Sequence, residues 1–113
     1  MSDGTIYDEN YFIHGRESGK SLYDNYRWLP DLTVPMCQTI VAHCGIHAGS
    51  NVIDFGCARG YHVKALRIMG HKAYGVDVSK WAIDNCDPDM IPYCKLLPDD
   101  SPPYRWGTID WII

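Results

Sequence analysis

Short apolar runs alternate with helical spacing in the second half of the chain. The run 51–55 (NVIDF) stands between the turn-forming HAGS and Gly56, which predicts a short strand. The segment 61–69 (YHVKALRIM) has apolar residues at i, i+3 and i+6, which predicts a helix that ends at Gly70. A second apolar run, 72–77 (KAYGVD), predicts another strand. The pattern is therefore strand, helix, strand.

The same alternation continues toward the C-terminus. Residues 79–86 (SKWAIDNC) predict a short helix with Ser79 as its N-cap. A weak strand is expected at 93–97 and a strongly apolar strand at 108–113, with a proline-rich loop between them. Strands and helices at this spacing form right-handed crossovers. We therefore expect an α/β fold, a Rossmann-like parallel sheet with flanking helices, truncated after the fourth strand.

A further helix precedes this unit. The segment DLTVPMCQTIVAHC has apolar residues at helical spacing, and Gly45 suits a left-handed stop after it. Because proline is tolerated only in a first turn, the presence of Pro35 predicts that the helix begins between Leu32 and Val34.

Residues 1–30 are distinct from residues 31–113, because they show little periodicity and many aromatic side chains. We divide the chain at this point. The first segment is expected either to pack over the sheet edge or to form a lid over a binding site. The side chains that suggest a lid are Tyr11, Tyr23, Tyr26 and Trp28, with Arg16 and Arg27.

Composition narrows the class of protein. At 113 residues the chain is one small domain, and 46% hydrophobic with 21% charged residues is ordinary for a soluble protein. The net charge of -4 argues against coating nucleic acid, and no apolar run approaches a membrane span. The five cysteines are odd in number and form no CxxC pair, so we expect a reducing, cytoplasmic location. The segment CQTIVAHCGIH matches no zinc-ligand spacing, and we predict no metal site.

Two acids frame a glycine turn at the tips of the first two strands. Asp54 ends the first strand, Gly56 and Gly60 flank the letters CAR, and Asp77 ends the second strand. Ligands of open parallel sheets bind at the carboxyl ends of strands, and an acid about twenty residues after the turn hydrogen-bonds ribose hydroxyls. The turn therefore predicts a nucleoside ligand.

Asp54 narrows the choice of nucleoside. A dinucleotide turn reads GxGxxG and holds a pyrophosphate, whereas this turn reads DxGxAxG. Two unit charges ~4 Å apart cost about 4 kcal/mol at an effective dielectric near 20, so a carboxylate here would repel phosphate. It would favour an ammonium or sulfonium group. S-adenosylmethionine (SAM) has both groups and no phosphate.

These residues resemble a known family. The stretch VIDFGCARGYHVKALRIMGHKAYGVDVS resembles the first two motifs of class I SAM-dependent methyltransferases, with Ala58 in place of a middle glycine. The leader YFIHGRESGKSLYDNYRWLP looks like that of some bacterial and phage-type members. The resemblance implies that Asp54 holds the methionine ammonium and Asp77 the ribose hydroxyls. It implies that Asp99 or Asp100, after the third strand, contacts the adenine amino group. The implied cofactor-binding residues are Asp54, Phe55, Gly56, Cys57, Ala58, Gly60, Asp77, Val78 and Asp99.

Structural alternatives remain open at the same positions. The alternative role of Asp77 is only to cap the following helix, which Ser79 can also do. The alternative for Asp54 is a structural ion pair with Arg59 or Lys64. Arg59 and His62 are otherwise expected to face solvent.

The resemblance implies that residues 31–113 are the N-terminal half of a SAM-binding domain, and that the chain is the cofactor-binding portion of an enzyme, a methyltransferase with an unidentified acceptor. The alternative is a non-catalytic SAM- or nucleoside-binding module that acts through self-assembly or a partner. The open sheet edge leaves three explanations: a fragment of a longer chain, a naturally short gene, or a homo-oligomer in which another copy pairs with the apolar edge strand.

Overall fold

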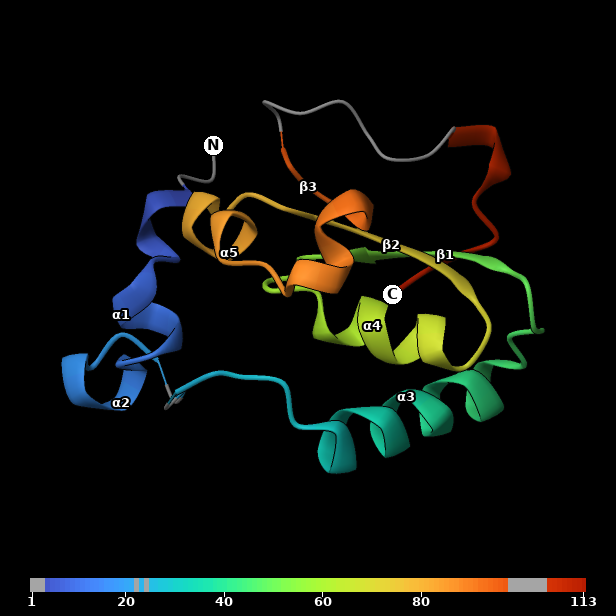
Figure 1. Ribbon diagram of the computed structural model, residues 1–113, viewed down its shortest axis with the longest axis horizontal. Coiled ribbons are helices and arrows are strands. Elements are labelled where there is room, and N and C mark those ends of the chain that lie inside the picture. Colours follow the sequence, from blue (N-terminus) through green and yellow to red (C-terminus); the bar gives the residue numbers. More distant parts are fainter. Residues whose placement is uncertain (1–3, 22, 24, 98–105) are drawn as a thin grey trace.

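The fold is a single parallel sheet with helices packed against it (Figure 1). The computed structural model describes residues 4–21, 23, 25–97 and 106–113. Its strands are β1 (Asn51–Phe55), β2 (Lys72–Asp77), β3 (Cys94–Leu96) and β4 (Trp111–Ile112). The strand order is β3-β2-β1-β4, and every pair is parallel. The predicted α/β, Rossmann-like fold class is confirmed. Because the order changes direction between β1 and β4, the carboxyl end of β1 lies at a topological switch point.

β1 and β2 bring the two predicted acids to the same edge of the sheet. Both strands have the bounds expected from their apolar runs. Phe55 pairs with Val76 in the parallel register, so Asp77 extends one position beyond the last pair. Asp54 precedes Phe55 on β1. The carboxyl ends of both strands therefore carry an acid.

The outer strands are shorter than the sequence predicts. The strand expected at 93–97 spans only Cys94–Leu96, and the one expected at 108–113 spans only Trp111 and Ile112. The start of the latter segment belongs to the 3₁₀ helix η3 (Trp106–Thr108). Hydrophobicity alone overestimated these strands because strand length is set by the backbone partners available, and only Trp111 and Ile112 pair with β1.

Three of the α-helices follow the predicted pattern. They are α3 (Pro30–Cys44), α4 (Tyr61–Ile68) and α5 (Lys80–Asp84). The other helices are η1 (Gly4–Ile6), α1 (Glu9–Phe12), α2 (Gly15–Ser18) and η2 (Pro88–Tyr93). In Figure 1, α4 lies between the sheet and α3, and these two helices contact each other. α4 begins directly after the turn that follows β1, so its packing fixes that turn.

The start of α3 was predicted wrongly. The helix begins at Pro30, before Leu32, and Pro35 lies in its interior rather than in its first turn. Pro30 suits the first position because its ring fixes a helical φ and its missing N–H would have no partner there. Pro35 cannot donate to the carbonyl of Asp31, four residues earlier, so the helix lacks one bond. Gly45 ends it in the left-handed region, as predicted, with φ 71°.

A glycine in β2 allows α4 and its turn to approach the sheet. A Cβ added at Gly75 would lie 2.5 Å from Cβ of Cys57 and 3.0 Å from Cγ2 of Val63. Cys57 and Val63 are both fully buried. Since any larger residue at Gly75 would displace them, the strand–turn packing depends on this glycine.

Candidate functional site

The turn between β1 and α4 consists of residues 56–60 and has an unusual backbone. Gly56, Ala58 and Gly60 all lie in the left-handed region, with φ of 81°, 51° and 84°. Glycine adopts this region freely, but for alanine the Cβ makes it costly, so the surrounding contacts must hold Ala58 in place. The middle position of the turn is therefore strained, a condition that clusters at ligand sites.

The backbone amides of four turn residues donate hydrogen bonds to acceptors within the protein. The amides of Gly56 and Cys57 both donate to the carbonyl of Val76, at 2.8 and 3.0 Å. The amide of Ala58 donates to Oδ2 of Asp77 at 2.7 Å, and that of Gly60 to the carbonyl of Cys57 at 2.9 Å. Turns that bind phosphate keep such N–H groups free for the anion. These four amides are already used.

The two glycines that flank the turn have different surroundings. A Cβ at Gly56 would meet nothing within 4 Å, whereas a Cβ at Gly60 would lie 3.0 Å from Sγ of Cys94 and 3.2 Å from Cβ of Met90. Gly60 is thus required by internal packing. Gly56 faces open space, where a ligand can approach its backbone closely.

Asp77 joins the turn to α5. Its Oδ2 accepts from the Ala58 amide, and its Oδ1 accepts from the Ser79 amide at 2.8 Å. Ser79 is the side chain that caps α5, since its Oγ accepts from the Ala82 amide at 3.1 Å. Helix capping is therefore the task of Ser79, as predicted. A carboxylate has about four lone-pair sites, so two backbone contacts leave capacity for further donors.

Asp54 is the least satisfied polar group in the described part of the chain. The residue is 7% exposed, and its Oδ2 is buried without a hydrogen-bond partner among the described residues. The neighbouring His62 Nδ1 lies 3.6 Å from this oxygen, beyond hydrogen-bond distance but within ion-pair distance when the imidazole is protonated. Leaving a buried acceptor unpaired costs about 1–3 kcal/mol, and more for a charged group. A cationic donor from a ligand would relieve that cost.

Arg59 and Lys64, considered from the sequence as ion-pair partners of Asp54, bind other residues instead. Arg59 donates through Nε to the Asn85 carbonyl at 2.7 Å and through Nη1 to the Tyr26 carbonyl at 3.1 Å. Lys64 Nζ lies 2.9 Å from Oδ2 of Asp87. Arg59, expected to face solvent, is only partly exposed, and its bonds join the N-terminal segment to the residues after α5.

A cavity of about 290 Å³ lies over the turn, and we call it the acidic cavity. It is lined by Tyr7, Tyr11, Phe12, Tyr23, Gly56, Ala58, Asp77 and Val78. One wall is therefore the predicted cofactor turn and strand tip, and the other is the aromatic N-terminal segment. The acid is Asp77. Its neighbour Val78 remains 37% exposed beside it.

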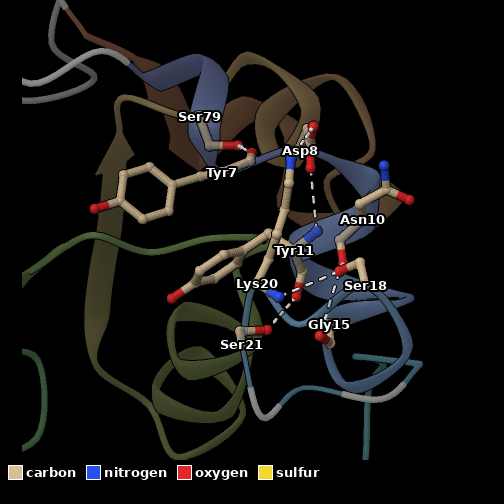
Figure 2. Close-up of polar contacts among 9 residues, drawn as sticks. All are labelled: Tyr7, Asp8, Asn10, Tyr11, Gly15, Ser18, Lys20, Ser21 and Ser79. Atoms are coloured by element: carbon tan, nitrogen blue, oxygen red, sulfur yellow. Dashed lines mark hydrogen bonds and ion pairs between the residues drawn. The ribbon is translucent and has the colours of Figure 1, made fainter.

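The aromatic wall is fastened by polar contacts (Figure 2). Ser79 Oγ donates to the Tyr7 carbonyl, and Ser21 Oγ donates to the Tyr11 carbonyl at 2.5 Å. The rings of Tyr7 and Tyr11 meet edge to face, with centroids 5.1 Å apart, and project to the same side in Figure 2. Phe12 stacks on Trp81 of α5, with centroids 5.6 Å apart. The segment thus packs on the domain and walls the cavity at once.

A second cavity of about 400 Å³ adjoins the first, and we call it the basic cavity. It is lined by Arg16, Tyr23, Asn25, Tyr26, Arg27, Leu29, Leu32, Thr33, Met36, Tyr61 and His62. Tyr23 lines both cavities. The sequence predicted the arginines as parts of a lid. It predicted that His62 faces solvent, whereas His62, the second residue of α4, lines this cavity with its side chain 34% exposed.

The other residues predicted to bind the cofactor line neither cavity with their side chains or lie outside the described residues. Phe55 is 44% exposed at the end of β1. The Cys57 side chain is 1% exposed and points into the core, so only its backbone belongs to the turn. Contact with Cys57 and burial raise the pKa of the Cys94 thiol, which keeps it protonated. Asp99, predicted to contact adenine, lies outside the described residues.

The described residues form neither a metal-binding cluster nor a membrane-spanning helix. In the described ranges, no group of three or more His, Cys, Asp or Glu side chains is arranged to hold a metal ion. None of the described helices combines the length and hydrophobicity needed to cross a lipid bilayer. No protein-family model matches the chain, and no curated protein matches it.

Proposed function

We propose that this chain binds SAM at the carboxyl ends of β1 and β2 and that it is the cofactor-binding portion of a methyltransferase. The observation that carries the proposal is the buried Oδ2 of Asp54, which accepts no hydrogen bond from the described residues and has only His62 Nδ1, at 3.6 Å, within ion-pair distance. A buried carboxylate oxygen without a partner is rare in proteins and marks a place where a ligand completes the hydrogen bonds. Because the group is anionic, the ligand group must be a donor and is best a cation, such as an ammonium.

The backbone of the turn supports a ligand without phosphate. The amides of Gly56, Cys57, Ala58 and Gly60 already donate to protein acceptors, so they are not available to a pyrophosphate. The Asp77 carboxylate also lies against the turn and would repel one. Nicotinamide and flavin dinucleotides are therefore disfavoured by geometry as well as by charge.

The acidic cavity suits an adenosine group. Asp77 has lone pairs left for ribose hydroxyls, and Gly56 leaves open space beside it. Rings such as Tyr11 supply apolar surface on which a base can stack, and base–aromatic stacking contributes about 1–3 kcal/mol. Val78 would cover another part of the base.

The chain's own residues would bind and orient the cofactor and would exclude water from it. When bound, SAM supplies a methyl group activated by its sulfonium. Asp54 and Asp77 would fix the two ends of the cofactor, and the aromatic wall would keep water away from it. Transfer then depends mainly on positioning the acceptor in line, which requires no further chemistry from this turn.

The decisive variant is Asp54→Asn. Asparagine keeps the shape but loses the charge, so affinity for S-adenosylhomocysteine should fall at least about 10-fold, the loss expected for one charge-assisted hydrogen bond. Because the unpaired buried charge is removed, the free energy of unfolding should rise by about 1 kcal/mol. Isothermal titration calorimetry and urea unfolding measure the two changes.

Asp84→Asn is the matched control for this experiment. Asp84 forms an exposed i,i+4 ion pair with Lys80, so its change should alter neither binding nor stability by more than about 0.5 kcal/mol. Unchanged affinity in Asp54→Asn would remove Asp54 from the site and, with it, the main support for SAM.

The alternative function is a SAM- or nucleoside-binding module without catalysis, acting through self-assembly or a partner protein. It is favoured by β4, which lies at an edge of the described sheet and leaves Ile112 61% exposed. Both functions share the cofactor site. They differ in whether a methyl acceptor binds beside it.

A further inference from the structure

The charge of the basic cavity differs from that of the chain. The protein has 10 lysines and arginines against 14 aspartates and glutamates. Yet the described residues that line this cavity include Arg16 and Arg27 and no carboxylate. Burial is the largest cause of the raised pKa values of Tyr26 and Tyr61, so both phenols are neutral. The arginines therefore set the sign of the charge in this cavity.

The walls of the basic cavity are apolar and incompletely covered. Leu32 is 62% exposed, Met36 is 41% exposed and Leu29 is 38% exposed, and all three line this one cavity. Exposed apolar side chains gathered in a hollow mark a binding site. A ligand that fits must therefore have an apolar or aromatic body in addition to an anionic group.

Arg27 is held in a position to bind such a group. Arg27 is exposed at the rim of the cavity, and its Nη1 donates to the Asn25 carbonyl at 3.0 Å, which restricts the orientation of the guanidinium. A guanidinium has five N–H donors in a planar fork, and this contact uses one of them. The fork matches a carboxylate in a bidentate arrangement, which a lysine ammonium does not.

The basic cavity also adjoins the proposed cofactor site. His62 lines it, and His62 Nδ1 lies 3.6 Å from Oδ2 of Asp54. Tyr23 is a wall of both cavities. A compound in the basic cavity would therefore lie beside the end of the cofactor that Asp54 is proposed to hold.

We propose that the basic cavity is the methyl-acceptor site and takes a small aromatic carboxylate, with Arg27 as the carboxylate-binding residue. This inference rests on the proposed function for the reaction, but the binding of the carboxylate can be tested without it. The volume of about 400 Å³ suits one substituted ring. The apolar walls would pack on the ring, and Arg27 would fix its orientation.

The test is a titration with 4-hydroxybenzoate, followed by NMR chemical shifts, with and without saturating S-adenosylhomocysteine. The acid should bind in both conditions, and at least about 10-fold more tightly than the neutral 4-hydroxybenzamide, because the amide cannot form the bidentate ion pair. Arg27→Gln should abolish that preference. Lys72→Gln removes an exposed cation that lines neither cavity and should keep it.

Two results would overturn the assignment. The first is equal affinity for 4-hydroxybenzoate and 4-hydroxybenzamide, or no binding of either compound. The other is a loss of S-adenosylhomocysteine affinity in Arg27→Gln with no loss for 5′-methylthioadenosine, which lacks the amino-acid end. That result would show that the carboxylate in this cavity belongs to the cofactor. If 4-hydroxybenzoate binds through Arg27 but S-adenosylhomocysteine does not bind at all, the carboxylate site stands, whereas the methyl-acceptor role and the proposed SAM function both fail.

Discussion

Gly56 and Gly49 have nearly the same backbone conformation in different surroundings. Their φ angles are 81° and 80°, and a Cβ at either would meet nothing within 4 Å. Gly56 lines the acidic cavity, whereas Gly49 lies in the loop before β1, where its amide donates to the Gly70 carbonyl. The pair therefore separates the backbone cost of a substitution from its effect on a ligand.

Gly56→Val should abolish binding of S-adenosylhomocysteine, and Gly49→Val should leave it unchanged. Both variants should lose stability by a similar amount, about 1–2 kcal/mol, because a β-branched residue is strained at positive φ. Calorimetry and thermal unfolding on both proteins test this expectation. Normal binding by Gly56→Val would place the cofactor elsewhere.

At the scale of elements, α4 holds three parts of the molecule together through one lysine. Lys64 Nζ lies 2.9 Å from Oδ2 of Asp87, before η2, and 5.0 Å from the ring centroid of Trp28 in the N-terminal segment. Asp87 is 8% exposed. The hydrogen bond from Lys64 to Asp87 raises the lysine's pKa. This stabilisation is fully present below the unfolded pKa and is lost only as pH rises through the higher folded value.

Lys64→Met should lower the free energy of unfolding by about 2–3 kcal/mol, because it leaves the Asp87 carboxylate nearly buried without its cation. Lys80→Met provides the control, since its ion pair with Asp84 is exposed and should contribute no more than about 0.5 kcal/mol. Urea unfolding at neutral pH compares them. Equal effects of the two substitutions would contradict the proposed role of Lys64.

At the scale of the whole molecule, β4 leaves apolar surface at an edge of the described sheet. Trp111 and Ile112 pair with β1 on one side, and Ile112 is 61% exposed. Exposed strand edges of this kind pair with other chains unless a charge or a cover prevents it. Self-association through this edge remains a prediction.

Ile112→Lys should shift the protein toward the monomer, because a lysine on an edge strand opposes pairing. Sedimentation velocity over a range of protein concentrations measures the shift. Ile91→Lys is a suitable control, since Ile91 is 56% exposed in η2 and away from β4. A concentration-independent monomer for the unmodified chain would rule out association through the edge.

The sequence determined the two central strands, β1 and β2, and the acids at their carboxyl ends. β1 and β2 have the predicted bounds because an apolar run between turn-forming residues is a local signal. Parallel pairing then places Asp54 and Asp77 at the same edge of the sheet. Ser79 was likewise identified as an N-cap from its immediate neighbours. Each of these features depends on residues close together in the chain.

Only the tertiary structure decided what each acid contacts. Arg59 and Lys64 are near Asp54 in sequence but bond to other segments, and His62 approaches it instead. Both cavities are walled by the N-terminal segment, which folds back over the turn at the acidic cavity and over the start of α4 at the basic cavity. Side-chain partners across such separations depend on how helices and strands pack in three dimensions, and hydrophobic periodicity carries no record of that packing.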